Sequence, residues 1–120
     1  MEALKFTLEV KQIPVEIDGE AYVLQELNGR ERDKYLNDIT ARVKIGPDGK
    51  PAGMKNFDGM QGNLLVASLR KKEGSELISV PFNTIQGWPA KMQSALFMEA
   101  QKLSGLDESQ KKDDEELGNV

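Results

Sequence analysis

The sequence predicts an α+β fold in which a small antiparallel N-terminal β-sheet packs against about three α-helices. Three observations support this prediction. Apolar and polar residues alternate near the N-terminus, an Asp18-Gly19 pair marks a hairpin turn, and later apolar residues recur at helical spacing. A chain of 120 residues has the length of one domain. We therefore expect a single domain over residues 1–106 and a disordered acidic tail over residues 107–120.

The first expected element is a half-buried strand, because four apolar residues near the N-terminus alternate strictly with polar ones. They are Leu4, Phe6, Leu8 and Val10. The apolar positions then change from even to odd numbers, and a one-residue shift turns side chains to the opposite face of a sheet. The change predicts a bulge, a break or a turn at Lys11-Gln12.

A β-hairpin is expected around Asp18-Gly19, which is a strong signal for a two-residue turn. The turn pairs Ile17 with Glu20, and this register places five apolar side chains on one face. They are Ile13, Val15, Ile17, Tyr22 and Leu24. Pro14 has no N–H to donate, so its strand is expected at a sheet edge or without pairing at that position.

A helix is expected over residues 29–43, with Asn28 as its cap and Glu31 as the partner of a capping box. Its apolar residues share one face, which we expect to cover the sheet. They are Tyr35, Leu36, Ile39 and Val43. Residues 44–56 are rich in Gly and Pro and predict a loop with a turn at Pro47-Asp48-Gly49. This segment lacks the spacing and the Lys-Ser/Thr ending of a phosphate-binding loop.

The next helix is expected over residues 57–69, where apolar side chains cover more than half of the circumference. Such a helix is either the buried centre of the domain or lies against a second chain. We favour the buried position, because Gly59 and Gly62 would allow other elements to approach closely. Val66 extends the apolar arc.

Three further features lie between this helix and the last one. Arg70, Lys71 and Lys72 form a basic cluster, which we expect in a solvated turn after the helix rather than in a phosphate site. Residues 76–82 are compatible with a short strand, and Thr84 is expected to cap a turn.

The clearest helix runs from Trp88 to Leu106, with Pro89 suited to its first position and Gly105 to the residue beyond its end. A stripe of apolar residues with Phe97 at its edge predicts its core-facing side. The stripe consists of Met92, Leu96, Ala100 and Leu103. Met98 falls on the opposite side.

Composition argues against catalysis, since the chain has neither His nor Cys. The usual proton shuttle, the cysteine nucleophile and the common zinc ligands are therefore missing, and we expect no enzyme activity, cofactor or metal site. An enzyme would depend on carboxylates such as Glu26, Glu31 and Asp33, whose positions near a helix start are explained by capping and the helix dipole.

Charge and hydropathy restrict the partners. Residues 107–120 hold two of the 16 basic and six of the 20 acidic residues, so the remainder is neutral and the net charge of −4 lies in this segment. Nucleic-acid binding depends on an excess of clustered basic residues, and the neutral residues 1–106 do not predict such an excess. The chain has no apolar run long enough to span a membrane and no signal peptide, and the absence of Cys is typical of the cytoplasm.

Several sequence segments, taken in their order along the chain, indicate a known family. They are VEIDGEAYVLQEL with its Gly19, Tyr22 and Leu27 spacing, DGMQGNLLVASL, and the closing helix from Trp88-Pro89 to Leu103-Ser104-Gly105-Leu106. With the alternating N-terminus and the charged helix between them, residues 5–106 resemble the tail assembly chaperones of long-tailed bacteriophages and related prophages.

The resemblance implies a fold of this class and a non-catalytic role in tail morphogenesis. Such chaperones are encoded before the tape measure protein, bind and solubilise it, and help to recruit tail tube subunits. They act in the bacterial host cytoplasm and are absent from the mature virion. Many have a short form and a frameshifted long form; this chain would be the short form, diverging within residues 107–120. Coating a long protein also predicts self-association.

Binding to amphipathic helices favours exposed Met and aromatic residues, because Met adapts its shape and Trp is frequent at interfaces. Met54 in the expected loop and Met98 outside the core stripe are the first candidates for partner contact. Trp88 is either packed over the helix start or part of an interface.

Two other functions remain open. The chain could be a minor structural tail protein or a head–tail completion protein that stays in the virion. It could also be a regulatory adapter that acts through its acidic tail, residues 107–120.

Overall fold

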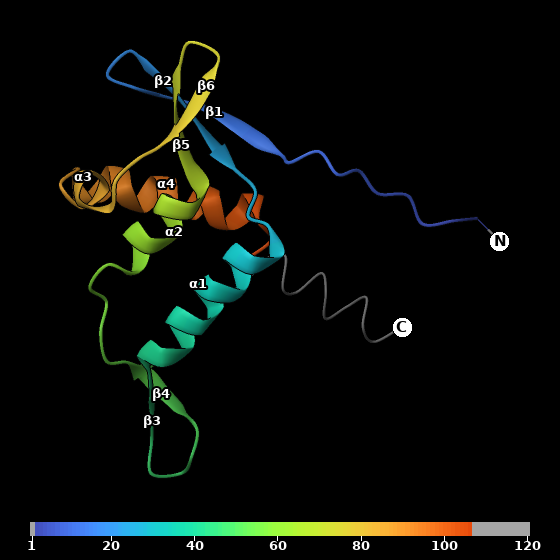
Figure 1. Cartoon of the computed structure of the whole chain (residues 1–120). Helices are drawn as coiled ribbons and strands as arrows, with labels where there is room; N and C mark the ends of the chain where they lie inside the picture. The colour runs from blue at the N-terminus through green and yellow to red at the C-terminus, as the bar shows by residue number, and fades with distance from the viewer. Residues whose placement is uncertain (1, 107–120) are drawn as a thin grey trace.

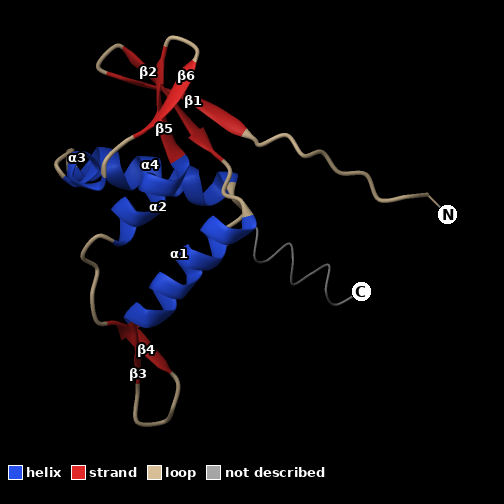
Figure 2. Cartoon of the chain, viewed as in Figure 1, coloured by secondary structure: helices blue, strands red, loops and turns tan. Residues whose placement is uncertain are grey.

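The computed structural model describes residues 2–106, and the predicted tail, residues 107–120, lies outside them. The predicted α+β class is confirmed (Figures 1 and 2). A four-stranded antiparallel sheet has the order β1-β2-β5-β6, and helices lie against one of its faces. Its strands are β1 (Gln12–Ile17), β2 (Glu20–Gln25), β5 (Leu69–Glu73) and β6 (Glu76–Ser79).

The hairpin of β1 and β2 has the predicted register. Ile17 pairs with Glu20, Val15 with Tyr22 and Ile13 with Leu24. Asp18 and Gly19 both have positive φ, 50° and 79°, as the two central residues of a type I′ turn require. Strand β1 lies at the sheet edge, which accommodates Pro14 as expected.

The predicted strand at residues 4–10 is wrong. Residues 2–11 are extended but pair with no other described strand, and Leu4, Phe6 and Leu8 are 85%, 90% and 102% exposed. The ladder ends where the Glu26 N–H donates to the Lys11 carbonyl (2.9 Å), because the chain then turns into a helix. The predicted break at Lys11-Gln12 is therefore confirmed, since β1 begins at Gln12.

Helix α1 (Gly29–Arg42) begins with the predicted capping box. The Glu31 N–H donates to Asn28 Oδ1 (2.9 Å), and the Asn28 N–H donates to Glu31 Oε1 (3.0 Å). The prediction that this helix covers the sheet is wrong. It packs against helix α2 and, through an edge-to-face contact of Tyr35 with Phe97, against helix α4. Helix α4 lies between α1 and the sheet (Figure 1).

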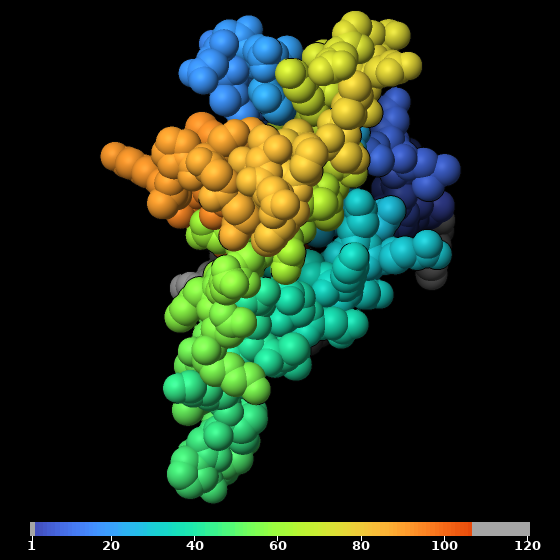
Figure 3. All heavy atoms as spheres, turned by 60° about the vertical axis from the view of Figure 1, so that its left-hand side comes forward, coloured from blue at the N-terminus to red at the C-terminus, as the bar shows by residue number. Residues whose placement is uncertain are grey.

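The predicted loop at residues 44–56 is instead a second hairpin. Strand β3 (Val43–Ile45) pairs with β4 (Pro51–Met54) around the predicted turn, in which the Gly46 N–H donates to the Lys50 carbonyl (2.8 Å). The hairpin forms a narrow projection at one end of the molecule (Figure 3). The sequence did not predict this hairpin, because its two strands are short and the segment is rich in Gly and Pro, so it shows no alternation of apolar residues.

Helix α2 (Met60–Ser68) has the predicted buried position, although it is shorter than expected at both ends. Leu64 and Leu65 are at most 1% exposed. An added Cβ at Gly62 would lie 2.9 Å from a ring carbon of Phe82, so the glycine allows close approach as predicted. The chain enters β5 at Leu69, so the basic residues 70–72 lie in a strand and the expected turn is wrong.

The end of the sheet leads into two helices. Strand β6 confirms the predicted short strand but ends at Ser79, and Pro81 precedes helix α3 (Phe82–Gln86). Thr84 lies inside this helix rather than at its cap, contrary to the prediction. Helix α4 (Ala90–Leu103) confirms the last predicted helix.

Helix α4 ends in a Schellman motif. The Leu106 N–H donates to the Gln101 carbonyl (2.8 Å), the Gly105 N–H donates to the Lys102 carbonyl (3.2 Å), and Gly105 has φ of 70°. The predicted core stripe of α4 is confirmed, and it packs with α2, α3 and the inner face of the sheet. Polar contacts join the same elements: the Ser68 hydroxyl donates to the Gln25 carbonyl (2.8 Å), and the Leu27 N–H donates to the Ser104 hydroxyl (2.9 Å).

Candidate partner-binding surface

A groove of about 420 Å³ lies between α1 and α2, and α3 contributes one residue to its lining. Helix α1 contributes residues at positions i, i+3, i+4 and i+7, and helix α2 contributes residues at i, i+3 and i+4; such positions share one side of a helix. From α1 these are Glu31, Lys34, Tyr35 and Asp38; from α2 and the residues after it they are Asn63, Val66, Ala67 and Arg70; α3 adds Phe82. Apolar side chains therefore line a slot whose sides also carry both signs of charge.

Charged groups of the groove are held by partners within this chain. Arg70 Nη1 donates to the carbonyls of Val66 (3.0 Å) and Leu69 (2.8 Å) at the end of α2, and Arg70 Nη2 lies 4.0 Å from Glu31 Oε2. Arg42 Nε donates to Asp38 Oδ2 (3.0 Å). These contacts hold three of the four charged side chains that line the groove, so a ligand does not have to order those three on binding.

Tyr35 is the most enclosed titratable group of the groove, at 9% exposure. Burial raises the pKa of its phenol above the ordinary value of 10.0; the hydrogen bond from Gln101 Nε2 (3.4 Å) opposes this effect and the Asp38 carboxylate reinforces it. The phenol is therefore protonated at neutral pH. A neutral phenol in this position serves packing and hydrogen bonding better than proton abstraction.

The carboxylates considered for catalysis are dispersed. Glu31 belongs to the capping box and is the only one of the three that lines the groove. Glu26 Oε1 accepts from the Lys11 N–H (3.3 Å), and Asp33 forms an exposed ion pair with Arg32 (3.2 Å). The structure therefore does not bring these three carboxylates together in one site.

The three residues predicted to contact a partner lie on separate elements. Met98 is 56% exposed on the outer side of α4, as its position outside the stripe predicted. Trp88 is partly buried between α3 and α4 and makes an edge-to-face contact with Tyr22, with ring centres 6.2 Å apart. Met54 is partly buried in β4 rather than in a loop. The structure thus brings none of them into the groove.

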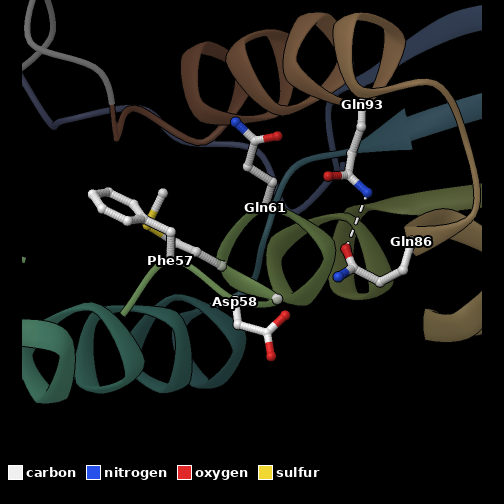
Figure 4. Close-up of a pocket in the computed structure, with 7 residues that line it drawn as sticks. Phe57, Asp58, Gln61, Gln86 and Gln93 are labelled. Atoms are coloured by element: carbon white, nitrogen blue, oxygen red, sulfur yellow. Dashed lines mark hydrogen bonds between the residues drawn. The ribbon is translucent and has the colours of Figure 1, made fainter. Parts of the chain in front are cut away.

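A second hollow, of about 370 Å³, lies between the start of α2 and helices α3 and α4 (Figure 4). Its polar lining is dominated by amides. Gln93 Nε2 donates to Gln86 Oε1 (3.0 Å) and to the Ile85 carbonyl (3.0 Å), and Gln61 Oε1 accepts from the Ser94 hydroxyl (3.2 Å). These amides are already bonded to each other and to the backbone, so they connect three helices.

Sequence reasoning missed the groove as a site, including Lys34, Ala67 and Phe82. The sequence offered one signal, Val66, which widens the apolar face of α2. In the structure this residue is only partly buried and lines the groove. The pairing of α1 with α2 could not be read from that signal, because it depends on α4 occupying the sheet face.

Within residues 2–106 no helix combines the length and apolarity needed to cross a membrane. The same residues hold no cluster of three or more acidic side chains suited to a metal ion. Comparison of the chain with protein-family models, with curated proteins and with solved structures found no match.

Proposed function

We propose that this chain is a non-catalytic tail assembly chaperone of a bacteriophage or prophage, which binds and solubilises the tape measure protein. The groove between α1 and α2 would hold one amphipathic helical segment of that protein. The proposal is supported by the order of sequence phrases described above and, above all, by one observation. Two helix faces and Phe82 form an apolar slot with fixed charges at its sides, the arrangement used where a helix binds in a groove.

The size of the groove fits reversible binding. Burial of one large apolar side chain contributes about 1.5–3 kcal/mol, whereas association costs at least about 4 kcal/mol in lost freedom of motion. A slot that receives a few side chains therefore binds weakly by itself. Many copies along one long helical protein would bind more tightly through multivalency and could still be displaced by tube subunits.

Recruitment of the major tail tube protein, self-association and a site of action in the host cytoplasm belong to the same proposal. Release during assembly would leave the chaperone out of the finished virion. A minor tail or head–tail completion protein would instead remain in purified particles, so their protein content distinguishes the two functions.

The experiment is co-expression of the full chain with the protein encoded immediately downstream, which the proposal expects to be the long tape measure protein. We expect the long protein to become soluble and to co-purify with this chain. Ala67→Glu puts a charge into the groove and should abolish co-purification. Ala95→Glu makes the same change on the exposed side of α4 and should leave it intact.

Equal solubility of the long protein with and without this chain, and no complex, would refute the chaperone function. Equal loss of binding in both variants, with both folded by circular dichroism, would refute the groove as the site. Met98→Glu tests the other exposed candidate in the same assay, and the groove model predicts a smaller effect than that of Ala67→Glu.

A further inference from the structure

The N-terminal arm, residues 2–11, has the sequence of a strand but no strand partner in the described chain. Leu4, Phe6 and Leu8 are almost fully exposed, and Val10 is about half exposed. Apart from its last residue the arm makes no backbone ladder, and it extends away from the body (Figure 1). Alternating apolar side chains with unpaired backbone groups form a strand ready to add to a sheet.

Within residues 2–106 one strand edge also lacks a neighbouring strand. Strand β6 is the last strand of the sheet, and its hairpin with β5 pairs Glu73 with Glu76 across a two-residue turn. Bonded and non-bonded positions alternate in such a hairpin, so the backbone groups of Leu77 and Ser79 point outward. Leu77 and Ile78 are 40% and 39% exposed at this edge.

The other edge of the sheet is a poorer acceptor. In the hairpin of β1 and β2 the same alternation directs the backbone of Pro14 and Glu16 outward. Pro14 has no N–H, so an added strand would lose a hydrogen bond at the middle of β1. Proline at an outward position is a common protection of sheet edges.

The arm cannot reach β6 of its own chain without crossing the sheet, because it leaves from β1 at the opposite edge. We propose that the N-terminal arm adds as a strand to the outer edge of β6 in a second copy of this chain. Among the described residues both the arm and the outer edge of β6 are unpaired, and because they lie at opposite sides of the sheet they can pair only between copies. This inference does not depend on the identity of the proposed chaperone's client.

The side-chain pattern agrees with this pairing. Ile78 lies on the same face of the sheet as Lys71 and Tyr22, to which it is linked by register, and this is the face that carries the core residue Leu24. An added arm with its even-numbered side chains on that face would cover Ile78 with Phe6 or Leu8. Its polar residues would then lie beside Leu77 and Ser79 on the other face.

Cysteine cross-linking of the full chain tests the pairing directly, because the natural chain has no Cys. One preparation carries Lys5→Cys or Thr7→Cys in the arm, and a second carries Ser79→Cys at the edge of β6. We expect that oxidation of a mixture of the two preparations gives a disulfide-linked dimer with one chain from each preparation. Glu16→Cys, at the outer edge of β1, is the control acceptor and should give at least tenfold less product.

Sedimentation equilibrium provides a second, independent test. Wild-type chain should associate with increasing concentration, whereas the double variant Phe6→Lys/Leu8→Lys should stay monomeric, since these exposed positions do not support the fold. The control Lys5→Glu/Glu9→Lys alters only polar positions and should associate as wild type does.

Three results would overturn the proposal. They are equal cross-linking to Glu16→Cys and Ser79→Cys, a wild-type chain that is monomeric at all concentrations, and association unaffected by the Phe6→Lys/Leu8→Lys change. Loss of client capture in that variant, with its self-association intact, would assign the arm to the client instead.

Discussion

The N-terminal arm and helix α4 carry the two clearest apolar repeats of this sequence, and folding treats them in opposite ways. In α4 the repeat of 3.6 residues is buried: Leu96, Phe97 and Ala100 are at most 8% exposed. In the arm the repeat of two residues is exposed along its whole length. The comparison shows that a periodic pattern predicts the local conformation, whereas burial requires a neighbouring element that the pattern does not specify.

The largest expected difference between the two regions concerns truncation of one leucine. Leu96→Ala removes a side chain of the buried core and should lower the free energy of unfolding by about 2–4 kcal/mol. Leu8→Ala removes a solvent-exposed side chain and should change it by less than about 0.5 kcal/mol. Urea unfolding of both variants in dilute solution measures the difference. Similar losses would show that the arm packs on the body.

A smaller effect is expected at the end of α4. Gly105 has φ of 70°, so Gly105→Ala forces an L-residue into the left-handed region and should destabilise the chain by about 1 kcal/mol. Gly29, at the start of α1, has open space around its added Cβ and no positive φ. Gly29→Ala should therefore be neutral or slightly stabilising. Thermal unfolding would contradict this account if the two glycines responded alike.

The smallest effect concerns pH, through the contact of Tyr35 with Phe97 of α4. The pKa of Tyr35 is raised in the folded chain by burial, so the folded state holds this proton more tightly than the unfolded state. Its contribution is fully present below pH 10.0, the unfolded pKa, and is lost as pH rises through the folded pKa.

Tyr35→Phe should therefore remove part of the decline in stability above about pH 10. The pKa of Lys71 is raised by its hydrogen bond to Glu20 and contributes in the same direction, so a residual slope should remain. Urea unfolding between pH 8 and pH 11 measures both slopes. An unchanged slope in the variant would show that Tyr35 is not buried in solution.

Local signals predicted much of the fold. The Asp18-Gly19 turn, the capping box of Asn28 and Glu31, and the end of α4 at Gly105 were all correct, because each depends on backbone geometry within a few residues. The errors concern distant partners. The strand predicted for the arm failed since the chain beyond Gln25 turns into α1, and β3 and β4 were too short to show a period.

The candidate site was harder to predict than the fold. Met98 was correctly expected to be exposed, and Trp88 packs on Tyr22. The groove depends on α1 packing beside α2, which follows from α4 covering the sheet in place of α1. This choice among helices involves contacts between distant residues, and the spacing of apolar residues in α1 fits either arrangement.

Amide hydrogen exchange of the full chain at low and high concentration tests most directly whether the arm is a strand that only a second copy completes. We predict that α4 amides are protected at both concentrations. Arm amides should exchange like those of an unstructured peptide in dilute solution and gain protection at high concentration. Protection of the arm in the dilute monomer, or its absence at every concentration, would contradict the account.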